Sequence, residues 1–447
     1  MMARAFLATL LPLTACALLG ACGDDASGEG DSASDSSGAG SSTDGDETGA
    51  TTPATTTPTT TDPTTTHSTE ATSGDDAGGT SGEGPTTDPT DPTGATDTGD
   101  TTGEPSLYDG EPLPGADDGT WTWIDFPEAK CRDGSSTGIG VRYGTAPGLV
   151  VFFEGGGACF NALTCGANPA NYGMGNFAGW APAGGQQGIF DIGNESNPVA
   201  DWSHVYVPYC TGDVHAGARP DGTLPDNPAP QQFVGYLNIG HYLQRVVPTF
   251  LGNVDHVLVT GVSAGGFGAA FNYDRIADAF PGEKVTLLDD SGPPMADDYM
   301  ATCLQKQWRE AWGLDDSMPA DCTDCFPADG GGIVHLGVYL GEKHKGQKLA
   351  LISSLGDNTI RFFFGFGNDN CNTLLPNTSE QKFTEGLHDL RDNWFTAPAD
   401  TWGTFFLSGQ QHTWIGGGSY TTAQSDGVLL LDWITDLING TVTNVGP

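Results

Sequence analysis

Short apolar runs alternate with longer segments of helical spacing from about residue 106 to the end of the chain. Residues 149–153 and 204–207 predict buried strands, and residues 236–250 repeat apolar side chains on one helical face. The other predicted strands lie at 256–260, 285–288, 349–352 and 404–407, and the other predicted helices at 266–280, 302–312, 380–394 and 422–437. Continuous apolar strands separated by helices indicate an α/β fold with a mostly parallel central sheet flanked by helices.

The N-terminal segment 1–22 has the features of an export signal. Arg4 is followed by an apolar stretch at 5–19, which is too short to span a bilayer. The sequence Leu-Gly-Ala-Cys ending at Cys22 resembles a bacterial lipobox and predicts lipidation of Cys22. Cys16 ends a weaker second candidate, and an ordinary cleaved signal would leave Cys22 without a role. We expect an exported protein, either lipid-anchored at the bacterial cell surface or outer membrane or secreted.

Residues 23–104 consist mainly of Thr, Asp, Gly, Ser and Pro, with almost no large apolar side chain. Such a segment cannot bury enough surface to offset its conformational entropy, so we predict a disordered, extended linker. Residues 105–447 remain for the folded part, which is long enough for one large α/β domain.

Acidic residues dominate the chain, whose formal net charge is −41. Between residues 23 and 118 there are 22 acidic side chains and no Lys or Arg, which leaves roughly −20 on the rest. This balance excludes nucleic acid as an expected partner and disfavours polyanionic substrates.

Eight cysteines follow the signal segment, and an even number in an exported domain predicts disulfides. They are Cys131, Cys159, Cys165, Cys210, Cys303, Cys322, Cys325 and Cys371. The spacing of Cys322 and Cys325 is also that of a metal or redox pair, but no second close Cys or His pair accompanies them. Disulfides are therefore the preferred interpretation.

The motif Gly-Val-Ser-Ala-Gly at 261–265 lies between a predicted strand and a predicted helix. A serine on such a strand-to-helix turn has its hydroxyl exposed for nucleophilic attack, and the flanking glycines allow the strained turn. A small-residue turn without chemistry is the competing interpretation, since the chain has 66 glycines. The placement of Ser263 favours the nucleophile.

A nucleophilic serine needs a base and an orienting carboxylate, which in parallel-sheet hydrolases follow it in the order acid, then histidine. Asp357 and His412 each follow a predicted strand and fit those positions. The open alternatives are Asp289, Asp290 and Asp369 for the acid and His335, His344 and His388 for the base. We expect His344 and His388 to be solvated residues.

A glycine run at 155–157 follows the strand at 149–153. Backbone N–H groups of such a loop, with that of the residue after the nucleophile, can stabilise a developing oxyanion. This assigns Gly156, Gly157 and Ala264 as donors, with a simple glycine turn as the alternative.

These motifs, together with Pro-Tyr-Cys-Thr-Gly-Asp-Val-His at 208–215 and Asp-Asp-Ser-Gly at 289–292, resemble the pectin acetylesterase family, which includes Notum-like carboxylesterases. The resemblance extends over about residues 105–447. It implies an α/β-hydrolase-like fold, ester hydrolysis without metal or cofactor, and the roles assigned above to Ser263, Asp357, His412, Gly156, Gly157 and Ala264. It also implies disulfides between Cys159 and Cys165 and between Cys131 and Cys210.

Two departures from the family pattern concern the substrate. Gly157-Ala158 stands where relatives often carry an aromatic residue, and Thr413 stands where they often carry cysteine. These positions border the acyl pocket and the loop of His412, so the family's substrate does not carry over to this chain. From the assigned residues we expect a monomeric serine carboxylesterase that removes short acyl groups such as acetyl from an extracellular polysaccharide or related ester. A polyester depolymerase or lipase-type esterase, or a catalytically silent surface-binding lipoprotein, are the alternatives.

Overall fold

The computed structural model describes residues 108–373 and 377–447. The predicted signal segment with Cys22, and the predicted linker 23–104, lie outside the described residues. No helix within the described part of the chain has the length and apolar character needed to cross a membrane.

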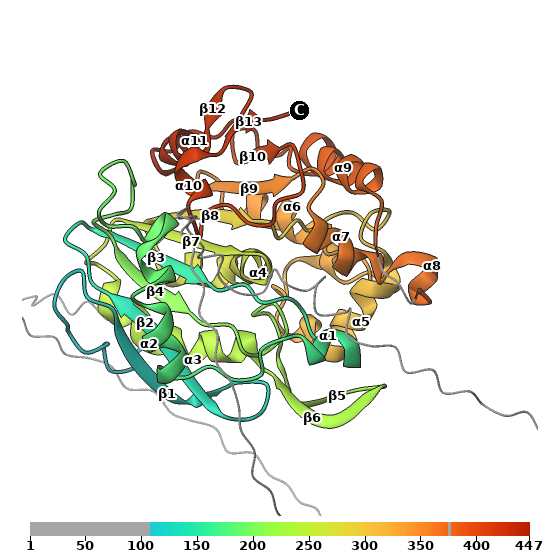
Figure 1. The fold of residues 1–447 in the computed structure, drawn as a ribbon, viewed down its shortest axis with the longest axis horizontal. Helices are drawn as coiled ribbons and strands as arrows, with labels where there is room; N and C mark the ends of the chain where they lie inside the picture. The colour runs from blue at the N-terminus through green and yellow to red at the C-terminus, as the bar shows by residue number, and fades with distance from the viewer. Residues whose placement is uncertain (1–107, 374–376) are drawn as a thin grey trace, which may run out of the picture. The chain divides into compact units, whose positions relative to one another are not determined.

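Nine strands form the central sheet, in the spatial order β1-β2-β4-β3-β7-β8-β9-β10-β13 (Figure 1). Every pair from β4 to β13 is parallel, and the two pairs that involve β2 are antiparallel. The mostly parallel sheet is therefore confirmed. The strands are β1 (Thr122–Lys130), β2 (Ser136–Arg142), β3 (Gly148–Phe153), β4 (Ser203–Val207), β7 (His256–Val262), β8 (Lys284–Asp290), β9 (Lys348–Ser354), β10 (Trp402–Leu407) and β13 (Asn444–Val445).

Side chains that alternate along each strand pack into two separate apolar layers, one on each face of the sheet. In β3, Leu149, Val151 and Phe153 belong to one layer, and Val150 and Phe152 belong to the other. The first layer is covered by α3 (Gly235–Phe250), α4 (Ala264–Ala279), α5 (Thr302–Trp312), α6 (Val334–Lys343) and α9 (Glu380–Asp389). The second is covered by α2 (Met174–Trp180), α10 (Ser419–Thr422) and α11 (Leu430–Ile438).

Shorter elements complete the described residues. Helices α1 (Ala162–Gly166), α7 (Asn358–Gly365) and α8 (Asn368–Cys371) lie in connections, and hairpins are formed by β5 (Arg219–Leu224) with β6 (Asn227–Phe233) and by β11 (Gln424–Ser425) with β12 (Val428–Leu429). Four 3₁₀ turns lie at Gly184–Gln186, Gly188–Phe190, Leu314–Asp316 and Thr323–Cys325, and a π-helical turn at Leu390–Trp394 follows α9.

Two predicted helices differ from the structure. The segment 380–394 is an α-helix only to Asp389 and continues as the π-helical turn. The single helix predicted at 422–437 is wrong, because α10 ends at Thr422 and a hairpin precedes α11. Gly427 turns that hairpin with φ of 78°, a conformation that glycine adopts at little cost.

The outer strands of the sheet are irregular or short. The pairing of β1 with β2 is interrupted between Phe126 and Lys130, where Pro127 lacks an N–H group. At the other edge β13 contributes only two residues, paired with β10. The carbonyl of Pro447, just beyond β13, lies 3.0 Å from Nε2 of His388.

All eight cysteines of the described residues form disulfides. The pairs are Cys131–Cys210, Cys159–Cys165, Cys303–Cys371 and Cys322–Cys325. The first two are the pairs that the family resemblance implied. The Cys322–Cys325 bridge agrees with the preference for a disulfide over a metal site.

Candidate active site

Ser263 occupies a sharp turn between β7 and α4, with φ of 58° and ψ of −121°. A residue other than glycine rarely adopts positive φ, and such strain is typical of functional positions. The neighbouring Gly261 and Gly265 are required because there is no room for a side chain at either position. A Cβ at Gly261 would lie 2.3 Å from the carbonyl oxygen of Gly265, and a Cβ at Gly265 would lie 2.0 Å from that of Phe153. The turn therefore has the geometry expected of a nucleophile elbow.

The backbone of Ser263 is held by its neighbours. Its N–H donates to the carbonyl of Asp290 at 2.7 Å, and its own carbonyl accepts the N–H of Gly266 at 2.9 Å. Its hydroxyl forms no hydrogen bond to another of the described residues. The backbone of Ser263 is thus fixed by hydrogen bonds, whereas its hydroxyl oxygen is not engaged in one.

Asp357 and His412, predicted as acid and base, lie in contact. Oδ2 of Asp357 is 2.8 Å from Nδ1 of His412. The carboxylate is fully buried, and its Oδ1 accepts the N–H groups of Thr359 and Ile360 at the start of α7, both at 2.9 Å. Capping of α7 therefore fixes the carboxylate, and the carboxylate in turn orients the imidazole ring.

The opposite ring nitrogen, Nε2 of His412, is buried and has no hydrogen-bond partner among the described residues. The direct bond to Ser263 that the sequence predicts is therefore not formed in this structure. Bonds between a nucleophile and its base are often long without substrate, so the pairing stays a prediction.

The glycine loop, residues 155–157 after β3, lies against the turn between β7 and α4 that carries Ser263. A Cβ at Gly155 would be 2.7 Å from the carbonyl of Val262 and 3.0 Å from Cβ of Ser263. The carbonyls of Gly156 and Gly157 are occupied, since they accept bonds from Nδ2 of Asn168 at 2.6 Å and from the hydroxyl of Tyr209 at 2.8 Å.

The N–H groups of Gly156, Gly157 and Ala264 have no hydrogen-bond partner within the described part of the chain. Gly157 adopts φ of 79°, and Ala264 is the first residue of α4, whose N–H has no acceptor within the helix. These are the donors that the sequence assigns to an oxyanion hole.

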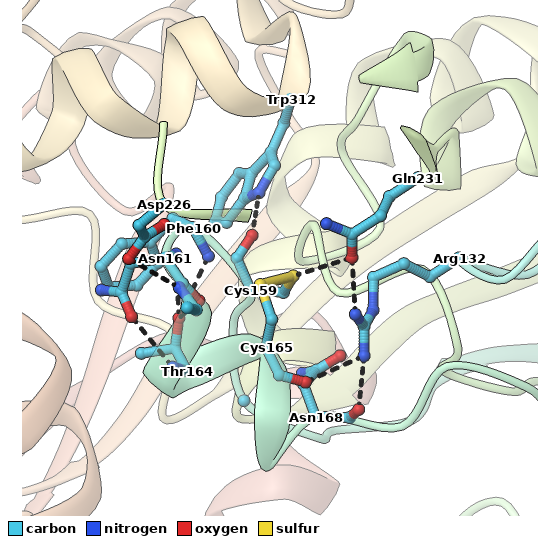
Figure 2. Close-up of a disulfide and its surroundings, with 12 residues drawn as sticks. Arg132, Cys159, Phe160, Asn161, Thr164, Cys165, Asn168, Asp226, Gln231 and Trp312 are labelled. Carbon is cyan, nitrogen blue, oxygen red and sulfur yellow. Dashed lines mark hydrogen bonds between the residues drawn. A yellow bond between two sulfur atoms is a disulfide. The ribbon is translucent and has the colours of Figure 1, made fainter. Parts of the chain in front are cut away.

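The segment after the glycine loop is fixed by the Cys159–Cys165 disulfide (Figure 2). Nε1 of Trp312 donates to the carbonyl of Cys159 at 2.8 Å, and the buried Arg132 donates to the carbonyls of Cys165 at 3.1 Å and Asn168 at 2.6 Å. Because Asn168 also holds Gly156, the disulfide region supports the conformation of the glycine loop.

An aromatic ring also contacts the glycine loop. A Cβ at Gly157 would lie 3.1 Å from Cζ of Phe363, which belongs to α7. Phe363 is half-buried and makes an edge contact with Phe362, whose ring also contacts Phe366. The sequence lacks an aromatic residue directly after the glycines, and α7 places one there from a distant part of the chain.

None of the alternative acids forms a hydrogen bond with the imidazole of His412. Oδ1 of Asp289 accepts the N–H of Gly292 at 2.8 Å, and Asp369 is exposed in α8. Asp290 accepts the N–H groups of Trp414 and Ile415, in the loop that carries His412. Burial raises the pKa of Asp290 to about 6, although the two N–H bonds act in the opposite direction.

The alternative bases have other partners. Nε2 of His344 lies 2.6 Å from Oδ1 of Asp274, so the expectation that His344 is solvated is wrong. The ring of His335 contacts Trp394, and the half-buried His388 contacts the Pro447 carbonyl.

One cluster has side chains of the kind that bind metal ions. Single ligand atoms of Asp274, Asp278 and His344 lie within 4.8 Å of one another. The ammonium of Lys343 bonds both carboxylates, at 2.8 Å and 3.0 Å, and supplies the positive charge there. An ion pair accounts for this cluster without a metal.

Two cavities lie away from these residues. One of about 340 Å³ is bordered by Leu407, Ser408, Trp414 and Pro447, and one of about 230 Å³ lies beside Arg142 and Trp202. Neither contains Ser263, Asp357 or His412 in its lining.

The parallel sheet, the strained serine turn and the Asp–His pair at neighbouring strand ends are the features of an α/β-hydrolase fold. The fold is similar to that of a solved structure titled as the Wnt deacylase Notum from Drosophila, with a TM-score of 0.53 and 20% sequence identity, over 72% of this chain and 95% of that one. Residues 120–327 match the family described as Pectinacetylesterase, which confirms the resemblance predicted from the motifs. That match includes Ser263 and the glycine loop and ends before Asp357.

Curated relatives are palmitoleoyl-protein carboxylesterases by name. The Drosophila melanogaster protein NOTUM is 28% identical over 218 residues, which are 44% of this chain and 32% of the relative. The Xenopus laevis protein notum1' is 25% identical over 328 residues, which are 70% of this chain and 51% of the relative. The chain thus spans between about a third and a half of the length of these relatives.

Proposed function

We propose that the protein is a serine carboxylesterase that removes short acyl groups, such as acetyl, from a polysaccharide or related extracellular ester. The observation that carries the proposal is that Ser263 at the end of β7 and the Asp357–His412 pair beyond β9 and β10 lie at the carboxyl ends of parallel strands of one sheet. Such an edge is where open α/β sheets bind their ligands. The family match and the carboxylesterase relatives support ester hydrolysis.

In the proposed reaction, the oxygen of Ser263 attacks the ester carbonyl while Nε2 of His412 accepts its proton. The oxyanion that forms is bound by the free N–H groups of Gly156, Gly157 and Ala264. His412 then protonates the leaving alcohol, and an acyl-enzyme remains. Water, deprotonated by His412, attacks this intermediate and releases the acid, while Asp357 stabilises the imidazolium in both steps.

The preference for a short acyl group is supported by the position of Phe363. Its ring packs against Gly157, beside the proposed oxyanion donors, where the acyl chain of a bound ester would begin. A large side chain there shortens the space available to the acyl group. The half-buried rings of Phe362 and Phe366 favour a second candidate, an esterase for longer apolar chains, which acyl-chain profiling from acetate to palmitate distinguishes.

Export and surface attachment through Cys22 complete the proposal. The four disulfides support an oxidising, extracellular location. Radiolabelled palmitate incorporation in the bacterial host, with Cys22→Ser as the control, tests the lipid anchor.

The central test uses the full chain with p-nitrophenyl acetate and a fluorophosphonate probe. We expect Ser263→Ala to lose at least about 10³-fold in kcat and all labelling, because the nucleophile is gone. Ser317→Ala, which changes a buried serine whose hydroxyl donates to the carbonyl of Leu314, is the control and should still be labelled. Substantial turnover by Ser263→Ala would refute the proposal, and an unlabelled wild-type protein would indicate a silent scaffold.

A further inference from the structure

Asp290, the last residue of β8, connects the two segments on which the proposed chemistry depends. Its backbone carbonyl accepts the N–H of Ser263 at 2.7 Å. Its side-chain Oδ2 accepts the N–H groups of Trp414 at 2.6 Å and Ile415 at 2.9 Å. One residue thus contacts both the serine turn and the loop that carries His412.

The loop that carries His412 (residues 408–418, between β10 and α10), called the histidine loop below, needs external support, because it contains no helix or strand. Thr413 adopts φ of 65°, a conformation that is costly for a β-branched residue. On the N-terminal side of His412, the carbonyl of Gln411 accepts the hydroxyl of Ser354 at 2.6 Å. On the C-terminal side, the Asp290 carboxylate holds the N–H groups two and three residues beyond His412. The backbone of His412 is therefore held from both directions.

A carboxylate suits this position better than a neutral side chain. Asp290 is fully buried, and its second oxygen, Oδ1, accepts the hydroxyl of Ser291 at 2.8 Å. Bonds from N–H groups to an ionised acceptor are roughly twice as strong as neutral ones. The side chain therefore has three donors around it and forms no hydrogen bond with the imidazole ring of His412, whose Nδ1 is taken by Asp357.

We propose that Asp290 is a positioning residue that fixes His412 relative to Ser263 by binding the backbone of the histidine loop. The inference rests on the proposed function, since it assigns Asp290 a part in that reaction. Displacement of a catalytic group by about 1 Å costs on the order of 10²-fold in rate, so the position of this loop has kinetic consequences.

Three variants of the full-length protein test the proposal. Asp290→Ala removes all three hydrogen bonds, whereas Asp290→Asn keeps an oxygen that can accept the N–H groups of Trp414 and Ile415. Asp289→Asn is the matched control, because Asp289 is a buried carboxylate on the same strand that bonds only the N–H of Gly292.

The measurements are kcat and KM for p-nitrophenyl acetate and the NMR signal of the His412 Nδ1 proton. We expect Asp290→Ala to lower kcat by about 10²-fold with KM within threefold, and to shift or lose the proton signal. Asp290→Asn should stay within about tenfold of wild type, and Asp289→Asn should match wild type in both measurements.

Two results would overturn the inference. One is an Asp290→Ala variant with wild-type kcat and an unchanged His412 signal. The other, which applies even if the alanine variant does not fold, is a loss of about 10⁴-fold in Asp290→Asn, because a loss of that size indicates a direct acid role. The NMR signal does not depend on turnover. If wild-type protein were inactive, the proposed function would fail, while the effect of Asp290 on His412 could still be read.

Discussion

The hydroxyl of Tyr209 donates a 2.8 Å hydrogen bond to the carbonyl oxygen of Gly157. The N–H of Tyr209 bonds the carboxylate of Glu154 at 2.7 Å, and its ring fills the space where a Cβ at Gly156 would lie, 2.4 Å away. Tyr209 therefore holds the glycine loop at both ends. The carbonyl of Gly157 belongs to the same planar peptide as the N–H of Ala158, so this bond fixes that peptide and the C-terminal end of the glycine loop.

Tyr209→Phe should lower kcat for p-nitrophenyl acetate by about tenfold, because the loop loses the bond that fixes Gly157. Tyr273→Phe is the control, since its buried hydroxyl also donates to a carbonyl, that of Val285, at 2.7 Å. Tyr273→Phe should lose about 1 kcal/mol of unfolding free energy, measured by urea denaturation, and Tyr209→Phe about 2 kcal/mol, because its hydroxyl also accepts the N–H of Val214 at 2.9 Å. Equal kcat values in the two variants would show that Tyr209 contributes stability alone.

Asp357→Asn should lower kcat by about 10⁴-fold with little change in KM, because an amide favours the wrong tautomer of His412. The asparagine can still cap α7, so the protein should remain folded. Asp369→Asn, at an exposed position, serves as the control for the acid assignment. Steady-state kinetics of both variants test this assignment. A comparable loss of kcat in Asp369→Asn would contradict the assignment of Asp357 as the acid.

Phe363→Ala should shift the preference of the enzyme toward longer acyl chains. Removal of the ring opens space beside Gly157, and each added methylene that gains apolar contact is worth about 1 kcal/mol or more. We expect the ratio of kcat/KM for hexanoate over acetate esters to rise by roughly tenfold, about 1.4 kcal/mol, if one or two of the added methylenes gain such contact. Phe362→Ala removes the neighbouring ring that makes no such contact with Gly157, and its ratio should stay near wild type. An unchanged ratio in Phe363→Ala would place the acyl site elsewhere.

Acid should destabilise the protein partly through His256. Burial, helped by the charge of Lys284, lowers the pKa of His256 to about 4, and its Nε2 lies 2.9 Å from the hydroxyl of Thr286. The unfolded chain binds a proton here below about pH 6.5, whereas the folded protein does so only near pH 4. Between those values the unfolded state holds more protons, so the free energy of unfolding falls as the pH is lowered, by at most about 1.4 kcal/mol per pH unit.

Urea denaturation between pH 4 and 7 measures this contribution as a difference between wild type and His256→Gln. The variant should show a shallower loss of stability on acidification. The comparison is needed because Asp213, whose pKa burial raises to about 6, acts with the opposite sign in the same range. Parallel curves for the two proteins would contradict the assignment.

Local patterns explain why much of the fold follows from the sequence. The strands at the centre of the sheet are continuously apolar because both faces are covered, and α5 has the bounds that its spacing predicts. The strands β1 and β2 were missed because they lie toward an edge of the sheet, where β1 mixes buried with exposed positions. The turn at Gly427 was missed although the polar residues 424–427 end in an Asp-Gly pair, which is typical of a tight hairpin turn.

The candidate site also has residues that the sequence predicts and contributions that it does not. Asp357 and His412 could be chosen because each follows a strand, and the structure brings them into contact. The contributions of Asp290 and Phe363 depend on contacts with segments more than a hundred residues away, which no local pattern encodes. The place of Asp290 after a predicted strand made it an alternative for the acid, but its bonds to the backbone of the loop that carries His412 could not be predicted from that position.

The irregular outer strands of the nine-stranded sheet, β1 and β13, affect how the protein behaves at high concentration. A long, regular outer strand is a template for strand addition by another molecule, and proteins avoid this with proline, bulges and very short outer strands. The interruption at Pro127 in β1 and the two-residue β13 provide such protection at both sides. Many copies can therefore be packed densely without polymerising through their backbones, and Pro127→Val should increase the tendency to aggregate in concentrated solution.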